Sequence, residues 1–403
     1  TYATLTNLPT VNNSLRMTSA NGYVFVLGGN SGSFLSTVYS AKVSADGTLS
    51  AWNTLTNLPV IIDLQGVATY NNYLFVTGGM TTGNASLSTV YSAKINLDGT
   101  IGSWNTLNTL PALIRSHGSV AANGYLFVVG GTDQISTVYS AQINGNGTIG
   151  TWATLSTMPA RNQDSLVLAT NGYLFVLGGL NGVPAVVSTV YSTPIKSDGT
   201  IGTWQTLNTL PQLLIAPTGG VANGYIYVAG GSTGNSNATA VSTVYSAKVN
   251  VDGTVGSWAV LNTLPSLVWL TAATTVNGYL FVAGGINSAG TSLSTVYSVP
   301  LQSDAFAFGT TNNFTAGNLL DIWNNNSSKV SLDYAGNLDR HGDIDNPIIN
   351  KALKPKDNDP DYCIECFECN TMNTLMSRRC IGNKDEKRCD HWFEWKDCHG
   401  CGT

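Results

Sequence analysis

Residues 171–179 read NGYLFVLGG, and this stretch decides the fold because it recurs along the chain. Six copies lie at intervals of 48 to 54 residues, each ending in a Gly-Gly pair. Their first residues are Asn21, Asn71, Asn123, Asn171, Asn223 and Asn277. A repeat of this length indicates one supersecondary unit that must stack on its neighbours to bury its apolar faces.

Each repeat predicts four antiparallel strands. In 173–177 both alternating sets of residues are apolar, which is typical of a strand covered on both faces. The preceding Asn171-Gly172 predicts a tight hairpin turn to another strand. After the Gly-Gly pair comes a loop, then the β-branched and aromatic segment STVYS at 188–192, then a turn at Asp198-Gly199. A fourth strand, anchored by Trp204, ends at Pro211.

Four strands per repeat predict an all-β, six-bladed β-propeller rather than the alternative β-helix or linear array. The last repeat has no fourth strand of its own. The chain opens with YATLTNLP at 2–9, and Tyr2 stands seven residues before Pro9, as Trp52 does before Pro59. We therefore expect the N-terminal strand to complete the last blade, with Tyr2 in the place of the tryptophan. This arrangement removes the open sheet edges of a linear stack.

The Gly-Gly after an apolar strand, the tyrosine of the next strand and the tryptophan followed by Leu-Pro resemble kelch repeats of galactose-oxidase-type propellers. The resemblance covers about residues 1–301. Propellers of this family are binding platforms more often than enzymes, so the resemblance implies a binding protein.

Spacing indicates where the repeats differ. The first Gly of each pair stands 19 residues after the preceding Pro in all six repeats, and only the loops between Gly-Gly and STVYS vary in length. These loops should share one face with the segments that follow each Leu-Pro, whose side chains differ most in chemistry. We take that face as the candidate ligand-binding face. Its residues are Asp63, Arg115, His117, Arg161, Asp164 and Trp269. The alternative is that they are ordinary solvated loop residues. The recurring Trp and Tyr are expected to pack between blades.

No catalytic residues are assigned, and we expect a protein that is not an enzyme. Residues 1–301 hold one histidine, His117, and no cysteine, so the ligands of an oxidase-like copper site are missing. A sialidase-like clamp needs three arginines, but Arg16, Arg115 and Arg161 occupy different positions in their repeats. The general-acid inventory is seven Asp and no Glu, and four of the Asp stand in turns.

Composition changes sharply along the chain. Residues 1–300 carry seven Lys/Arg and seven Asp, whereas residues 339–403 carry ten Lys/Arg and thirteen Asp/Glu. The predicted units are the propeller at 1–301, a hairpin connector at 302–338 and a charged, cysteine-rich module at 339–403. No basic patch points to nucleic acid, and no apolar run is long enough for a membrane helix. The Ser/Thr/Asn-rich propeller, the start at Thr1 and the triplets at Asn84, Asn146 and Asn237 favour a secreted or surface-displayed protein.

The end of the chain leaves two alternatives open. All seven cysteines follow residue 360. They either form disulfides, with one left free or paired with another chain, or include a zinc site. The four zinc candidates are Cys366, Cys369, Cys398 and Cys401. Residues 319–323 and 329–334 predict a short hairpin, and this stretch resembles stalk modules of phage tail fibres and bacterial surface fibres.

Two functions follow from these observations. The first is a binding protein that recognises a glycan or a protein ligand through the propeller loops. The second is a structural head of an extracellular fibre or appendage, with possible self-association through the C-terminal region. Neither needs a cofactor beyond the possible zinc ion.

Overall fold

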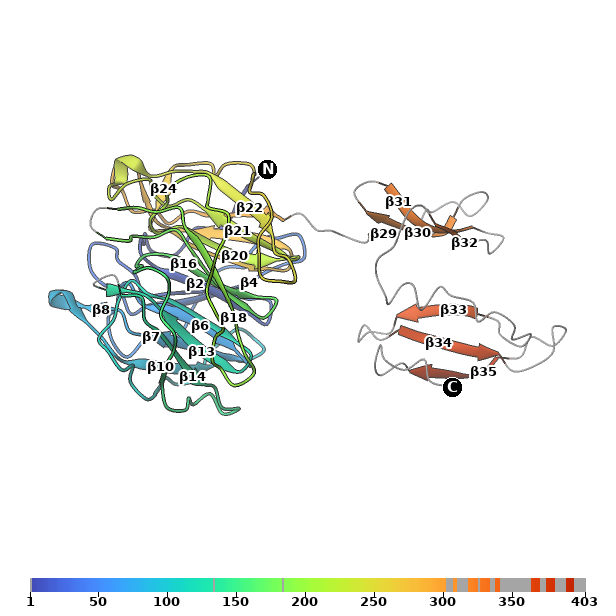
Figure 1. Cartoon of the computed structure of the whole chain (residues 1–403), viewed down its shortest axis with the longest axis horizontal. Coiled ribbons are helices and arrows are strands. Elements are labelled where there is room, and N and C mark those ends of the chain that lie inside the picture. The colour runs from blue at the N-terminus through green and yellow to red at the C-terminus, as the bar shows by residue number, and fades with distance from the viewer. Residues whose placement is uncertain are drawn as a thin grey trace. The chain divides into compact units, whose positions relative to one another are not determined.

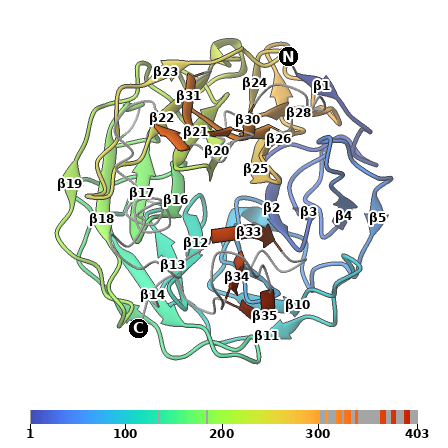
Figure 2. The same ribbon diagram turned by 90° about the vertical axis from the view of Figure 1, so that its right-hand side faces the viewer.

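The computed structural model describes residues 2–132, 135–182 and 185–301 and, further along, the backbone of strands β29 to β35. The chain divides into two units, Thr1–Ser303 and Asp304–Thr403 (Figure 1). The first unit is an all-β propeller of six four-stranded antiparallel sheets, as predicted. Figure 2 shows these sheets arranged in a ring, with β2, β12, β16, β20 and β25 nearest to its centre.

Every blade repeats the same strand order from the centre outwards. The innermost strands are β2 (Arg16–Ala20), β6 (Gly66–Tyr70), β12 (Gly118–Ala122), β16 (Leu166–Thr170), β20 (Thr218–Ala222) and β25 (Ala272–Val276). The second strands are β3 (Tyr23–Leu27), β7 (Tyr73–Thr77), β13 (Tyr125–Val129), β17 (Tyr173–Leu177), β21 (Tyr225–Ala229) and β26 (Tyr279–Ala283). The third strands are β4 (Val38–Lys42), β10 (Val90–Lys94), β14 (Val138–Gln142), β18 (Val190–Pro194), β22 (Val244–Lys248) and β28 (Val296–Pro300).

The outer strands are shorter than the sequence suggests. They are β5 (Asn53–Thr54), β11 (Asn105–Thr106), β15 (Ala153–Thr154), β19 (Gln205–Thr206), β23 (Ala259–Val260) and β1 (Ala3–Thr4). Beyond its two paired residues the outer segment keeps only single bonds to the third strand, such as those from the Leu207 and Leu210 N–H groups. The reason is that its leucines turn into the inter-blade core, where Leu210 is buried.

The N-terminal strand closes the ring, as predicted. Strand β1 pairs with β28, so that Ala3 lies opposite Ser298 and Thr4 opposite Tyr297 (Figure 2). Further along, the Leu5 N–H donates to the Val296 carbonyl over 2.9 Å. Tyr2 packs against the core between blades five and six, and burial raises the pKa of its hydroxyl to about 12.

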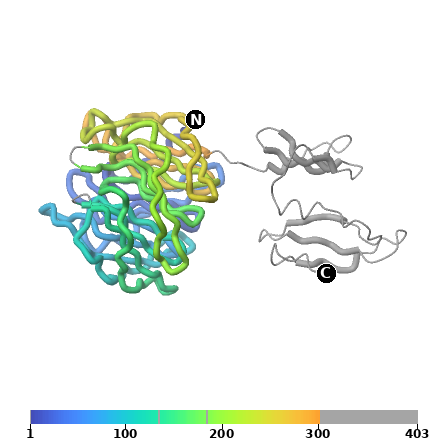
Figure 3. The backbone as a smooth tube through the Cα atoms, in the orientation of Figure 1, coloured from blue at the N-terminus to red at the C-terminus, as the bar shows by residue number. Residues whose placement is uncertain are grey.

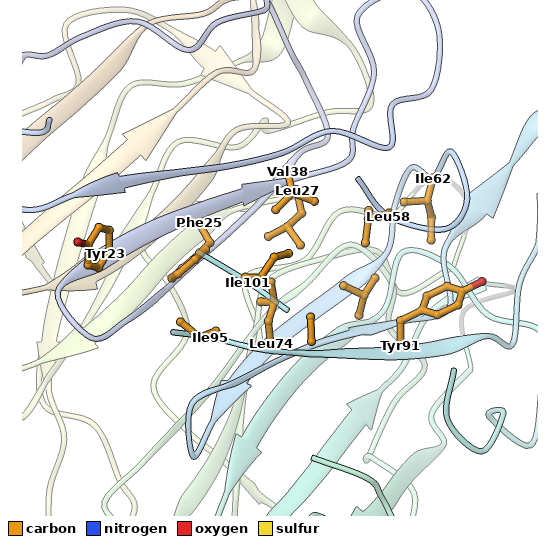
Figure 4. Close-up of a cluster of buried hydrophobic side chains, with 12 residues drawn as sticks. Tyr23, Phe25, Leu27, Val38, Leu58, Ile62, Leu74, Tyr91, Ile95 and Ile101 are labelled. Carbon is orange, nitrogen blue, oxygen red and sulfur yellow. The ribbon is translucent and has the colours of Figure 1, made fainter. Parts of the chain in front are cut away.

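The core lies between blades rather than inside one sheet. In β17, Phe175 and Leu177 pack towards the next blade, whereas Leu174 and Val176 pack towards the preceding one. Figure 4 shows the equivalent cluster between the first two blades, with Phe25 and Leu27 facing Leu74. Both faces of the second strand are therefore buried, which explains why the motif is apolar throughout.

The recurring tryptophans join neighbouring blades, as expected. The Trp104 indole N–H donates to the Thr56 carbonyl of the preceding blade over 3.1 Å, and Trp52 makes the same bond to Thr6. The recurring Tyr of the third strand, such as Tyr91, is buried between blades. These aromatic positions are therefore structural.

Left-handed residues flank the second strand: Gly stands before it in five blades and Asn72 in the second, and a Gly-Gly pair follows it in all six. Asn171 and Gly172 have φ angles of 51° and 78°, which identifies the tight turn favoured by Asn-Gly. At the other end Gly178 has a φ of 62°, and a Cβ there would lie 2.6 Å from the Leu214 carbonyl oxygen. The Gly-Gly pair thus lets the backbones of adjacent blades approach each other.

Among the described residues, the variable loops and the segment after Pro265 carry the short elements outside the blades. In the loops these are β8 (Met80–Thr81), η1 (Thr82–Asn84), β9 (Ala85–Ser86), η3 (Asn237–Thr239) and β27 (Ile286–Asn287), and after Pro265 comes β24 (Val268–Trp269). Figure 3 traces the backbone of the propeller that carries them, coloured along the chain.

The second unit contains two separate sheets. One has the order β29 (Ala307–Gly309), β30 (Asn318–Asn324), β31 (Ser327–Asp333) and β32 (Leu338–Arg340). The other is β33 (Ile364–Cys369), β34 (Leu375–Cys380) and β35 (Cys389–Glu394). The antiparallel pair β30–β31 matches the predicted hairpin. The side chains of the cysteines, and with them the choice between disulfides and zinc, lie outside the described residues.

Candidate functional site at the propeller axis

One end of the propeller, here called the loop face, carries both the variable loops and the segments that follow Leu-Pro. Asp63 forms a β-bridge with Met80, the first residue after Gly78-Gly79, and Trp269 pairs with Ile286 in the same way. The Thr132 N–H donates to the Arg115 carbonyl over 2.8 Å. The predicted sharing of one face is therefore confirmed.

A ring of left-handed residues surrounds the axis on this face. The fifth residue after each Pro has a φ between 47° and 55°, although none is glycine. The six are Ser14, Leu64, Ser116, Asp164, Ala216 and Leu270. Such a conformation costs about 1–2 kcal/mol per residue. Hydrogen bonds between blades hold it, for example from the Asp164 N–H to the Ser116 carbonyl over 2.9 Å. Repeated strain of this kind is typical of a binding surface.

Inside this ring opens an axial cavity of about 440 Å³, lined by residues of the innermost strands and the ring. Small and hydroxyl-bearing side chains, such as Thr18, Ser119 and Thr274, form much of its wall. Its titratable lining residues are Arg16, His117 and Asp164. The charge of the loop face is therefore concentrated at the axis.

Arg16 begins the innermost strand of the first blade. One guanidinium nitrogen, Nη1, donates to the Ser14 and Leu15 carbonyls, both over 3.2 Å. Burial lowers the pKa of Arg16, and the nearby charges of Asp63 and Asp164 oppose that change. The sequence analysis did not place Arg16 at the site. The signal was present, because the equivalent residues of the other blades, Gly66 among them, are all uncharged.

Two carboxyl groups lie near Arg16. Asp63 is buried, and its carboxylate accepts a hydrogen bond from the Leu64 N–H over 2.8 Å. Burial raises the pKa of Asp63 to about 6, although Arg16 and the Leu64 N–H favour its charged form. Burial also raises the pKa of Asp164, against hydrogen bonds from Ser116 and Gln163. A perturbed carboxyl group that lines a cavity, as Asp164 does, is typical of a functional site, and Asp63 lies nearby.

His117 is buried between blades. Its Nε2 atom hydrogen-bonds with the Thr77 hydroxyl over 2.9 Å. Burial and the charge of Arg16 lower the pKa of His117 to about 3, so the ring is neutral at physiological pH. Its Nδ1 atom is buried, and within the described residues it has no hydrogen-bond partner. His117 therefore supplies a neutral polar wall rather than a charge.

The other predicted site residues lie away from the cavity. The Arg115 Nη1 atom donates to the Asn84 carbonyl over 2.7 Å, which ties it to the variable loop of the second blade. Trp269 is half-buried in the β24–β27 pair. Arg161 is exposed. The structure thus brings His117 and Asp164 to the axis with Asp63 nearby, and leaves Arg115, Arg161 and Trp269 around them.

The raised pKa of Asp63 predicts that this residue destabilises the fold at neutral pH. The pKa of Asp63 in the folded state exceeds its ordinary value of 3.8. Below about pH 4 the protonated side chain costs the fold nothing, and the fold loses stability as the pH rises through 6 and the side chain becomes charged. A change of about two pKa units corresponds to about 3 kcal/mol. We expect Asp63→Asn to raise the free energy of unfolding by up to about that amount at pH 7.5 and very little at pH 4.

Urea unfolding of both proteins at several pH values measures this difference. His117 acts with the opposite sign between pH 3 and 6.5, because its folded pKa is lowered, but it is present in both proteins and cancels. Asp98→Asn is the matched control, since Asp98 is exposed and its pKa is lowered by hydrogen bonds from Thr100. A gain for Asp63→Asn that is independent of pH would contradict the assignment.

In the part of the chain that the structure describes, no three His, Cys, Asp or Glu side chains come together in a way that could hold a metal ion. No helix there has the length and apolar character needed to cross a membrane.

Comparison with known proteins supports the assignment of the fold. A model of the kelch motif matches residues 270–299, which hold most of the last blade. The solved structure titled "Structure of YjhT" resembles this chain with a TM-score of 0.60 at 14% identity, covering 74% of this chain and 97% of that one. At this identity the likeness concerns the fold alone. No curated protein sequence matches the chain. The match of the last repeat to the kelch motif and the six-bladed fold together support a kelch-repeat β-propeller at residues 1–301.

Proposed function

We propose that this protein is a binding protein of the extracellular space or cell surface that recognises a glycan or a protein ligand on its loop face. A kelch propeller suggests a binding or scaffold role. One observation carries the proposal. Arg16, His117 and Asp164 surround an axial cavity of about 440 Å³, on the face that also holds the only loops of variable length.

The chemistry of the cavity favours a polar ligand group. Arg16 lines the cavity, its Nη1 atom donates to two backbone carbonyls, and its guanidinium carries further N–H donors. Asp164 supplies an acceptor, and hydroxyl groups such as that of Ser119 can donate or accept. A ligand that offers both donors and acceptors therefore fits this site better than an apolar one.

Binding to a printed glycan array and to a peptide array tests the proposal, followed by variants at the site. We expect Arg16→Met and Asp164→Asn to weaken binding about tenfold or more, because each leaves a desolvated partner unpaired. Lys94→Met is the control, since Lys94 is exposed at the opposite end of its blade. Unchanged binding by both site variants would show that the ligand does not bind at the axial cavity.

A structural role in an extracellular fibre is the second candidate. The observation in its favour is the β30–β31 hairpin, which lies where the sequence resembles fibre stalk modules. Chains that bind no array ligand but assemble end to end, as seen by electron microscopy, would favour it.

A further inference from the structure

The loop face carries an unusual set of exposed aliphatic side chains. The second residue after each Pro is exposed, and in five of the six blades it is Val, Ile or Leu, with exposed fractions of 39% to 66%. We call these five residues the aliphatic ring: Val11, Ile61, Leu113, Leu213 and Leu267. Arg161 holds the sixth position. Single exposed aliphatic residues are ordinary, but the same position in five blades forms a patterned surface.

The fold does not require an aliphatic residue at this position. In every blade the next residue donates its N–H to the residue before the STVYS-type segment. Asn162, which follows Arg161, donates its N–H to the Ile135 carbonyl. Ile62, which follows Ile61, donates its N–H to the Leu35 carbonyl in the same way. An arginine is therefore accepted without a change in the backbone, and packing does not explain the other five residues.

The opposite face gives a useful contrast. It carries the exposed charges of the third strands and the turns that follow them: Lys42, Lys94, Lys196, Lys248, Asp46, Asp98, Asp198 and Asp252. It also has two isolated exposed aliphatic residues, Leu97 and Val251. On the loop face, among the residues that the structure describes, Arg161 is the exposed charged side chain.

We infer that the aliphatic ring is the contact surface for a second copy of this chain, docked loop face to loop face, so that this dimer and the ligand of the proposed function compete for the same face. A two-fold interface must be self-complementary, because the same patch serves both partners. A ring with aliphatic residues at five of its six positions meets most of this condition, and Arg161 then faces either the partner's Arg161 or an aliphatic residue. The near absence of exposed charge removes the like-charge repulsion that a copied charged surface would create.

The area of the aliphatic ring fits this role. At the exposures given above the five residues present on the order of 400 Å² of mostly apolar surface, distributed over five blades. A standard interface buries about 800 Å² on each partner, and slightly more than half of it is apolar. The ring therefore supplies the apolar part of one such interface, and the Ser, Thr and Asn of the surrounding loops supply its polar rim.

Sedimentation velocity of the full chain over a concentration series tests the inference, with reductant present so that the tail cysteines do not cross-link. We expect a dimer. The double variant Leu113→Lys with Leu213→Lys should raise the dimer dissociation constant at least about tenfold. The matched control, Leu97→Lys with Val251→Lys on the opposite face, should leave it unchanged. Circular dichroism melting shows that both variants remain folded.

Three results would overturn the inference. One is a wild-type chain that stays monomeric at every concentration. Another is a dimer that the ring variant does not weaken, because the contact then lies elsewhere. The third is a monomer that binds phosphatidylcholine vesicles in a flotation assay, with binding abolished in the ring variant. In that case the aliphatic ring contacts a lipid surface and not a second copy.

Discussion

Gly178→Ala is expected to lower the free energy of unfolding of the propeller by about 3 kcal/mol, with roughly half from the backbone and half from crowding. Gly178 has a φ of 62°, which costs an L-residue about 1–2 kcal/mol. A Cβ there would also lie 2.6 Å from the Leu214 carbonyl oxygen of the next blade. That oxygen accepts the Gly179 N–H over 2.7 Å, so it cannot move away without breaking a bond between blades.

Gly172→Ala separates the two contributions. Gly172 has a similar φ of 78°, but no atom lies within 4 Å of a Cβ built there. We expect this control to cost about 1–2 kcal/mol, which is the backbone part alone. Urea denaturation followed by tryptophan fluorescence measures both variants. Equal losses would mean that close approach between blades is not why the Gly-Gly pair recurs.

Removal of residues 1–8 is expected to have the largest effect, a loss of about 5 kcal/mol or more, comparable with the whole stability of many domains. The truncated chain loses the β1–β28 pairing and the burial of Leu8. It also loses the acceptor of the Trp52 indole, the Thr6 carbonyl. The unpaired edge of β28 should then promote aggregation.

A peptide of residues 1–9 added to the truncated chain should restore much of the melting temperature. The same peptide with Leu5→Asp and Leu8→Asp should not, because Leu8 is buried and Leu5 packs against the same core. Differential scanning calorimetry follows both. A truncated chain that melts at the temperature of the full chain would show that the first strand does not close the ring.

The fold was predictable because the repeat supplies many copies of the same information. The apolar strand and the Gly-Gly pair recur six times, so that counting them gives the blades, and an Asn-Gly turn precedes the strand in five of the six repeats. The position of Tyr2 relative to Pro9 indicated the closing strand in the same way. Repetition did not indicate the length of the outer strands. Leu207 and Leu210 fit a strand pattern in the sequence, but in the structure they turn into the core between blades.

The site was predictable only in part, because it depends on where the repeats differ. His117 and Asp164 were expected on the loop face, and they line the axial cavity. Arg16 was missed because it begins the innermost strand, one position beyond the segment after Pro from which the candidates came. Spacing along the chain does not show that the seventh position reaches the axis.

The strand β1 also sets an order of events during synthesis. It is the first segment of the propeller to leave the ribosome, yet its partner β28 ends at Pro300. Until then five blades can pack on one another while β1 waits for the other three strands of its blade. Contacts so distant in sequence form slowly, because the loop entropy must be overcome first. The growing chain therefore carries an unpaired β1 for most of its synthesis, and its final closure comes after translation of the propeller is complete.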